Sequence, residues 1–200
     1  MKGETEKQAD YNLFERVQNG DMVAFNELVE KYKQRLMNVI TRMIQSNEEA
    51  EDIVQETFVR VYQHRASFDF KHCFSTWLYT IALNLARNEL RKRKRFKFFD
   101  IFDLKGNEAE IAVEMDMPSN LPQILQKAVD TLPEKYKTAF ILRDIEELPY
   151  EEVAKVMNIP LGTVKSRVNR ARALLREKLK PRMEEYNALS KGTLLPVSLL

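Results

Sequence analysis

The stretch LPYEEVA (residues 148–154), followed closely by NIPLGTVKSR (residues 158–167), decides the fold of this chain. Acidic residues stand in the first turn of the first segment, as favoured at a helix N-terminus. A four-residue turn then leads into a second helix, which we expect to be capped around Gly162 and Thr163. A short helix, a tight turn and a second helix together predict a helix-turn-helix.

The second helix of this motif has two different sides. Its apolar side is expected to pack on the preceding helices and comprises Val164, Val168, Ala171 and Leu175. Its other side is polar and basic. Asn and Arg can make bidentate contacts to base edges, and flanking cations can neutralise phosphates. We therefore favour a helix that lies in a DNA major groove over a surface helix that is merely basic. The outward residues are Lys165, Ser166, Asn169, Arg170, Ala173 and Arg176, with Arg167 and Arg172 flanking them.

The rest of the chain is predicted to be helical as well. Apolar residues recur at helical spacing from Phe25 to Met43, a second helix opens at Asn47, and a third begins near Ser75. The periodicity fails from Phe96 to Asn120, and helical signals then resume, with Pro133, Pro149 and Pro160 at helix starts. We predict an all-α fold of two small helical domains joined by a flexible linker. The expected boundaries are a first domain at 1–95, an acidic linker at 96–120, a second domain at 121–182 and a tail of unknown role at 183–200.

Composition excludes several classes of protein. A single cysteine, Cys73, rules out an intramolecular disulfide, and with only His64 and His72 beside it a Cys/His zinc cage is not available. The five glycines form no nucleotide-binding loop. We therefore expect no metal and no cofactor. The polar N-terminus and the absence of a long apolar run predict a soluble, cytoplasmic protein.

The charges are segregated into blocks along the chain. Residues 61–97 carry 9 basic and 2 acidic residues, residues 98–134 carry 2 and 8, and residues 135–200 carry 13 and 8. Alternating blocks suggest two surfaces for a polyanion, joined by a connector that the same polyanion repels. Two solvated helix faces are the alternative.

The third predicted helix and the loop before it suggest a second nucleic-acid surface. Aromatic rings beside cations and an amide suit an unstacked base, because a ring gives a stacking platform and Asn84 can read a base edge. Core packing of the aromatic residues is the competing interpretation. The loop is Phe68-Asp69-Phe70-Lys71-His72-Cys73-Phe74, followed by Trp77, and the outward helix side is Thr80, Asn84, Arg87, Asn88 and Arg91.

Three blocks, in order, resemble the extracytoplasmic-function (ECF, group IV) sigma factors of the sigma-70 family, which are bacterial transcription initiation subunits. Residues 50–62 resemble conserved region 2.2, and residues 74–86 resemble regions 2.3 and 2.4. The stretch from Leu132 to Arg167 is similar to region 4. The resemblance covers roughly residues 12–95 and 121–180.

The resemblance implies a protein without catalytic residues that binds core RNA polymerase and directs initiation at promoters. Region 2 would dock on the clamp coiled coil of the β′ subunit through Asp52, Gln55, Glu56 and Arg60, with a Glu56–Arg60 helix pair as the alternative for those two, and region 4 would meet the β flap. The minus-ten element would be held by Phe68, Asp69, Phe70, Lys71, His72, Phe74, Trp77, Thr80, Asn84, Arg87, Asn88 and Arg91. The minus-thirty-five element would be read by Thr163, Lys165, Ser166, Arg167, Asn169, Arg170, Arg172 and Arg176.

Two further partners follow from the resemblance. An anti-sigma factor, often membrane-anchored in this family, would cover both DNA-binding domains. The acidic linker would lie in a cationic polymerase channel that normally carries RNA, through Asp100, Asp103, Glu108, Glu110, Glu114 and Asp116.

Two positions depart from the family pattern, and two other classes of protein stay open. Pro149 stands where a small or polar residue is common, and Glu147 where glycine is frequent, so the turn before the motif is expected to differ. A stand-alone helix-turn-helix regulator would need a dimerisation helix, which is not evident. A nucleic-acid enzyme would need carboxylates or metal ligands converging on one site.

Overall fold

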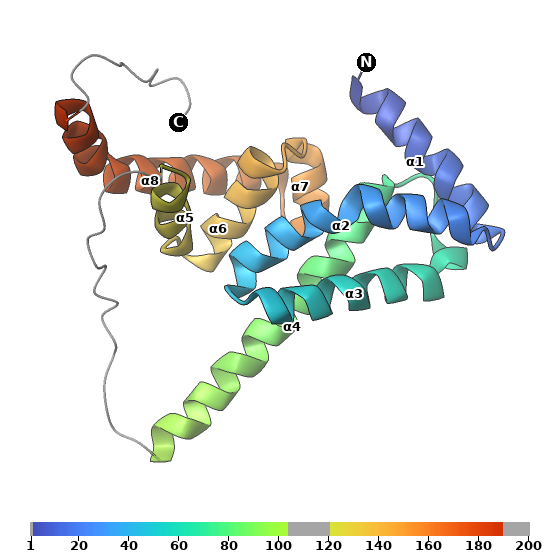
Figure 1. Ribbon diagram of the computed structural model, residues 1–200, viewed down its shortest axis with the longest axis horizontal. Coiled ribbons are helices and arrows are strands. Elements are labelled where there is room, and N and C mark those ends of the chain that lie inside the picture. Colours follow the sequence, from blue (N-terminus) through green and yellow to red (C-terminus); the bar gives the residue numbers. More distant parts are fainter. Residues whose placement is uncertain (1, 104–120, 190–200) are drawn as a thin grey trace.

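The computed structural model describes residues 2–103 and 121–189 of the chain (Figure 1). Within those residues the regular structure is helical throughout, with no strand, in agreement with the predicted fold class. The elements are α1 (Lys2–Gln18), α2 (Met22–Ile44), α3 (Asn47–Gln63), η1 (Arg65–Ser67), α4 (Phe74–Asp103), α5 (Leu121–Asp130), α6 (Glu134–Phe140), η2 (Ile141–Ile145), α7 (Tyr150–Met157) and α8 (Leu161–Leu189).

Helices α1 to α4 form the N-terminal half of the molecule. Local capping sets where two of them begin, because Asp21 accepts from the amides of Val23 and Ala24 at the start of α2, and Ser46 accepts from Glu49 at the start of α3. Side chains at helical spacing on α2 and α3 are buried between the helices, as their apolar pattern predicts.

Two boundaries in this half differ from the prediction. The apolar pattern places no particular helix before Phe25, yet α1 lies there, and Phe14 and Val17 on its inner side are fully buried. Helix α4 starts at Phe74 and runs to Asp103, past the point where the apolar periodicity stops. The basic run from Arg91 to Arg95 is made of good helix formers, and Arg93 within it donates to the carbonyl of Ile44 at 2.7 Å, so the helix continues past the apolar pattern. The side chains of Asp100 and Asp103, and all of residues 104–120 and 190–200, lie outside what the structure describes.

Helices α5 to α8 form the C-terminal half. The three prolines stand directly before α6, α7 and α8, as predicted. The turn between α7 and α8 is three residues long and not four, because Asn158 ends α7 in a left-handed conformation and α8 already begins at Leu161. The four apolar residues of α8 predicted to face inward are at most 1% exposed.

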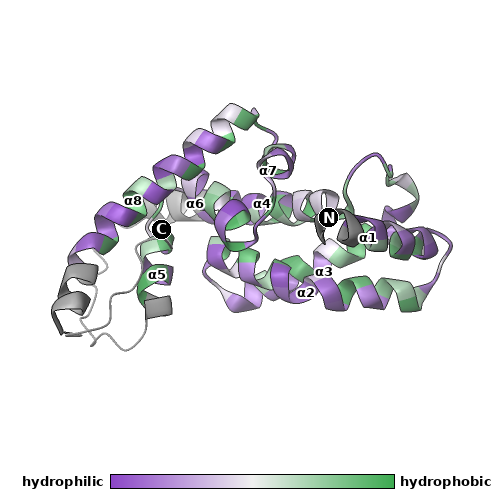
Figure 2. Cartoon of the chain, turned by 90° about the horizontal axis from the view of Figure 1, so that it is seen from above, coloured by the Kyte–Doolittle hydropathy of each residue, from purple (hydrophilic) through white to green (hydrophobic). Residues whose placement is uncertain are grey.

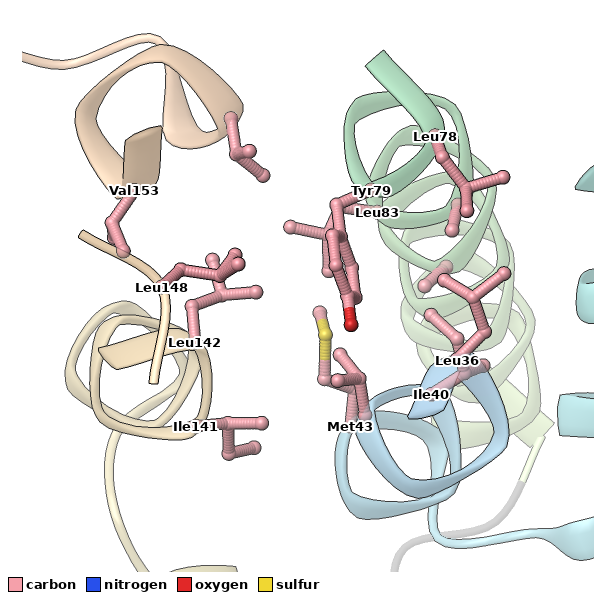
Figure 3. Packing of buried hydrophobic residues seen from close by; sticks show 14 of the residues in the cluster. Leu36, Ile40, Met43, Leu78, Tyr79, Leu83, Ile141, Leu142, Leu148 and Val153 are labelled. Atoms are coloured by element: carbon pink, nitrogen blue, oxygen red, sulfur yellow. The ribbon is translucent and has the colours of Figure 1, made fainter. Parts of the chain in front are cut away.

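The two halves pack against each other through an apolar interface (Figure 3). Met43 of α2 and Tyr79 and Leu83 of α4 face the C-terminal half, which presents Leu142 and Leu148. All five are buried in one continuous core. The picture of two separate modules held by a linker is therefore incomplete, because in this structure the modules share a core.

Among the described residues, no helix is both long enough and apolar enough to cross a membrane.

Candidate nucleic-acid and polymerase surfaces

Helix α8 exposes the side that the sequence predicts for DNA. Its residues alternate between hydrophilic and hydrophobic along the helix (Figure 2), because one side is buried and the other faces solvent. We call the exposed residues the recognition face. They are Lys165, Ser166, Asn169, Arg170 and Arg176, all exposed, with Thr163 and Arg167 half-buried at its edge.

Arg172 does not belong to the recognition face in this structure. Its guanidinium donates two hydrogen bonds to Asp144, at 2.8 and 2.6 Å. This pairing raises the pKa of Arg172. A bidentate ion pair of this kind fixes the geometry of both side chains. Arg172, predicted to contact DNA, therefore connects α8 to η2 in this structure.

The aromatic loop divides into a buried part and an exposed part. Phe68 and Phe74 are 7% and 1% exposed, and both make ring contacts with Phe14 and Trp77. The core interpretation is therefore confirmed for Phe68 and Phe74, which support the loop and do not present a surface. Phe70 is 38% exposed, and Asp69, Lys71 and His72 are exposed beside it.

The outward side of α4 follows this loop directly. Asn84, Asn88 and Arg91 are exposed, and the hydroxyl of Thr80 donates to the carbonyl of Thr76 within the helix. Arg87 is half-buried. Its burial lowers its pKa, and the nearby cations Arg91 and Arg167 lower it further while Glu134 opposes them. The cationic side of α4 therefore approaches the edge of the recognition face.

The predicted polymerase-docking residues share the outer face of α3. Asp52, Gln55, Glu56 and Arg60 are all exposed. Glu56 and Arg60 form the i,i+4 ion pair that was the alternative for them, at 2.7 Å. An exposed pair of this kind stabilises a helix by only about 0.3–0.5 kcal/mol, so both groups can exchange it for contacts with a partner.

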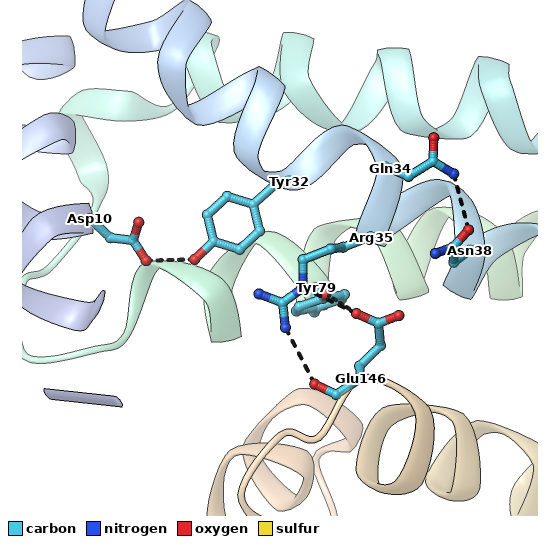
Figure 4. A network of polar contacts seen from close by, with 7 residues as sticks. All are labelled: Asp10, Tyr32, Gln34, Arg35, Asn38, Tyr79 and Glu146. Atoms are coloured by element: carbon cyan, nitrogen blue, oxygen red, sulfur yellow. Dashed lines mark hydrogen bonds and ion pairs between the residues drawn. The ribbon is translucent and has the colours of Figure 1, made fainter. Parts of the chain in front are cut away.

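A group of polar contacts joins the two halves, and the sequence did not reveal it (Figure 4). The carboxylate of Glu146 is nearly buried and accepts from the hydroxyl of Tyr79 at 3.0 Å and from Arg35 at 3.3 Å. Arg35 also donates to the Glu146 carbonyl at 3.3 Å. Burial and the neighbouring carboxylate raise the pKa of Tyr79, so its hydroxyl remains a donor. Tyr79 and Arg35 lie 67 and 111 residues before Glu146 in the sequence, so no local pattern could have paired them.

A second contact joins the halves beside the aromatic loop. Glu152 of α7 is 6% exposed, and its carboxylate lies 2.8 Å from the Nζ of Lys7 and 3.5 Å from the hydroxyl oxygen of Ser75. The hydrogen bond to Glu152 raises the pKa of Lys7. This contact brings α1, α4 and α7 to one point.

Comparisons with known proteins match both halves. The family model described as sigma-70 region 2 matches residues 28–96, and that of sigma-70 region 4 matches residues 123–175. The ECF RNA polymerase sigma-E factor of Haemophilus influenzae is 38% identical over 188 residues, covering 89% of this chain and 99% of that protein. The ECF RNA polymerase sigma factor SigW of Bacillus subtilis is 38% identical over 176 residues, covering 82% and 94%.

Solved structures agree with this match. The sigma factor RpoE of Bartonella quintana, solved with the anti-sigma factor NepR, has a TM-score of 0.64 at 28% identity, covering 78% of this chain and 96% of that one. CnrH, solved with the cytosolic domain of CnrY, has a TM-score of 0.65 at 23% identity, covering 86% and 98%, and shows the shared fold. A stand-alone helix-turn-helix regulator would not account for the match over residues 28–96. With both conserved regions present in order and close relatives along nearly its whole length, the chain belongs to the ECF sigma factors of the sigma-70 family, the RNA polymerase subunits for promoter-specific initiation.

Proposed function

We propose that this sigma factor binds core RNA polymerase through the outer face of α3 and reads two promoter elements with its two halves. The minus-thirty-five element is assigned to the recognition face of α8, and the minus-ten element to the exposed part of the aromatic loop and the outward side of α4. The observation that carries the proposal is the recognition face, where cations and an amide are exposed opposite a fully buried apolar side.

The chemistry of each surface fits its assigned task. On α8, Asn169 and Arg170 can form bidentate contacts with base edges in a major groove, and Lys165 and Arg176 can neutralise phosphates. On the N-terminal half, Phe70 offers an exposed ring on which an extruded base can stack, and stacking of this kind is tolerant of sequence.

The protein has no catalytic role of its own in this proposal, because core polymerase makes the RNA. Stabilising an extruded base lowers the cost of opening the duplex, which is a binding task and not a chemical step. Since its partners are core polymerase and promoter DNA, we place the protein in the cytoplasm.

An anti-sigma factor is the expected regulator. RpoE of Bartonella quintana, 28% identical to this chain, was solved with one. We propose a partner that covers the recognition face and the outward side of α4 together, because the charge of Arg167 at the edge of the recognition face is near enough to lower the pKa of Arg87 on α4. The assigned domains are residues 1–95 and 121–182, with the acidic linker 96–120 passing through a cationic polymerase channel.

Run-off transcription with core polymerase and the full chain tests the proposal. DNA bound by the holoenzyme is first selected from a random library, and the selected sequences then serve as templates. Asn169→Ala and Arg170→Ala are expected to lower initiation at these templates, since each removes a base-edge contact worth about 1–3 kcal/mol. Lys155→Ala, an exposed cation on α7 outside the recognition face, is the matched control and is expected to leave initiation unchanged. A chain that does not associate with core polymerase contradicts the proposal.

A further inference from the structure

Glu152 of the C-terminal half fills a site for an anion on the N-terminal half. The site consists of the ammonium of Lys7 and the hydroxyl of Ser75, the second residue of α4. The first-turn amides of a helix have no partner within the helix, and the helix dipole adds a partial positive charge there. The carboxylate of Glu152 is 6% exposed, and its contacts here are the ammonium of Lys7 and the hydroxyl of Ser75 in the first turn of α4, groups that favour an anion.

This anion site adjoins the loop assigned to the minus-ten element. Residues 68–74 end at the first turn of α4, and the hydroxyl of Tyr11 donates to the carbonyl of His72 at 3.1 Å. The ring of Tyr11 also meets the exposed ring of Phe70 edge-on, at 5.9 Å between centroids. The ring available for an extruded base therefore lies close to Lys7, and each nucleotide of a strand that places a base there also carries a phosphate nearby.

We propose that the site formed by Lys7 and Ser75 binds a backbone phosphate of the single-stranded promoter DNA, and that Glu152 occupies it in the free chain. This inference rests on the proposed function, because it places the strand on the aromatic loop. The carboxylate and the phosphate carry like charge and compete for one site. Docking of the two halves then limits the binding of single strands, and separation of the halves removes Glu152 and frees the site.

The size of the effect follows from the competition. If most free chains are closed, the apparent affinity for a strand equals the affinity of the open form multiplied by the fraction of chains that are open. Glu152→Gln keeps the shape of the side chain and removes its charge, which weakens the contact with Lys7. We expect Glu152→Gln to raise the open fraction about 5- to 10-fold. The variant should then bind single-stranded DNA about 5- to 10-fold more tightly than the wild type.

The experiment uses the full chain and a fluorescein-labelled 12-nucleotide single-stranded DNA of mixed sequence, read by anisotropy at several salt concentrations. Glu151→Gln is the matched control, because Glu151 is the exposed neighbour of Glu152 on α7 and loses the same charge. Its affinity is expected to stay within about twofold of the wild type, the size of a long-range charge effect in salt. Equal tightening by both variants overturns the inference, because net charge would then explain it.

Lys7 provides an independent test. Lys7→Ala is expected to weaken strand binding and to reduce the slope of affinity against salt by about one phosphate contact. Lys33→Ala removes an exposed cation from α2 as the control. In the double variant with Lys7→Ala, the gain from Glu152→Gln should disappear. A gain that persists without Lys7 overturns the phosphate site, and far-UV circular dichroism confirms that each variant is folded.

A second arm separates the DNA strand from free phosphate. Inorganic phosphate, at matched ionic strength, is expected to leave strand binding by Glu152→Gln unchanged within about twofold, because a single dianion lacks the contacts of a strand. Loss of strand binding at millimolar phosphate indicates a free-phosphate site and overturns the DNA assignment. Core association and run-off initiation by the wild type test the proposed function separately, so the inference can fail while that function stands.

Discussion

Removing the hydroxyl of Tyr79 is expected to loosen the two halves from each other while leaving the core filled. Tyr79 is fully buried at the interface, and its hydroxyl donates to the carboxylate of Glu146 at 3.0 Å. Tyr79→Phe keeps the ring and its packing, so no cavity forms. The only loss is one hydrogen bond to a nearly buried carboxylate.

The magnitude follows from the type of bond that is lost. A hydrogen bond to a charged group contributes about 1.5–3 kcal/mol net, and its removal leaves the other group less well satisfied. Glu146 keeps Arg35 at 3.3 Å, and the Arg35 side chain is 40% exposed, so water can reach this pair. We therefore expect Tyr79→Phe to lower the free energy of unfolding by about 2 kcal/mol.

Urea unfolding followed by two probes shows where this loss acts. Trp77 is the only tryptophan and lies in the N-terminal half, so its fluorescence reports that half alone. Far-UV circular dichroism reports the helices of both halves. In the wild type the shared core predicts coincident transitions. In Tyr79→Phe the dichroism transition is expected to begin at a lower urea concentration than the fluorescence transition, because the halves unfold less cooperatively.

Tyr32→Phe is the matched control within one half. Tyr32 is 2% exposed, and its hydroxyl donates to the carboxylate of Asp10 at 2.5 Å, so the same chemistry is removed without touching the interface. It is expected to lower stability by a similar amount, about 2 kcal/mol, while the two probes stay coincident. The reasoning is refuted if Tyr79→Phe leaves both transitions at their wild-type positions, or if the two variants affect both probes identically.

Three further predictions follow from local geometry. Glu147 has a φ of +57° in the turn before α7, so Glu147→Gly is expected to raise the free energy of unfolding by about 1 kcal/mol in urea titrations, whereas Glu147→Ala should give no such gain. Arg172→Ala breaks the bidentate pair with Asp144 and is expected to cost about 1 kcal/mol of stability, whereas Arg170→Ala should leave the urea midpoint unchanged and lower promoter binding by the holoenzyme. Hydrogen bonds from the Ala24 amide and from Arg16 hold the pKa of Asp21 below its usual value of 3.8, so the stability that this cap gives is complete above pH 3.8 and is lost as the pH falls through the lower pKa of the folded chain. Asp21→Ser keeps a cap that does not titrate and should flatten the acid-unfolding curve in that range; equal slopes for both chains would contradict this assignment.

Features set by neighbours in sequence were predictable. The inner and outer sides of α8 follow from a period of 3.6 residues alone. The prolines before α6, α7 and α8 mark the helix starts for reasons that act within one turn. The turn at Glu147 is expected to differ from the family pattern, and this remains a prediction; in this chain its backbone adopts the left-handed conformation that glycine enters freely. A glutamate in that conformation adds strain to the turn.

Features set by distant contacts were not predictable. Arg172 lies on the side of α8 where a cation suits DNA, but its guanidinium pairs with Asp144. Only the packing of η2 on α8 brings these two residues together. Phe68 and Phe74 have the composition of a stacking surface, and α1, a helix that the apolar pattern does not locate, covers them with Phe14. An aromatic residue in a loop can serve either purpose, and the helix that decides between them lies more than fifty residues earlier in the chain.

The polar contacts between the halves bear on the proposal that the halves can separate. An interface of Leu142, Leu148 and their neighbours alone would lose apolar burial on opening, at about 25 cal/mol per Å². Glu146 and Glu152 add ion pairs and hydrogen bonds to this burial, but both carboxylates lose hydration to form them. Each carboxylate gives up hydration when it docks and regains it when the halves separate, so desolvation offsets most of what its contacts contribute. Glu146 and Glu152 therefore determine how the two halves are positioned against each other more than how strongly they dock. Under the proposed function the halves separate on polymerase, and two buried carboxylates on an apolar face would make the docked arrangement specific without adding much to its strength.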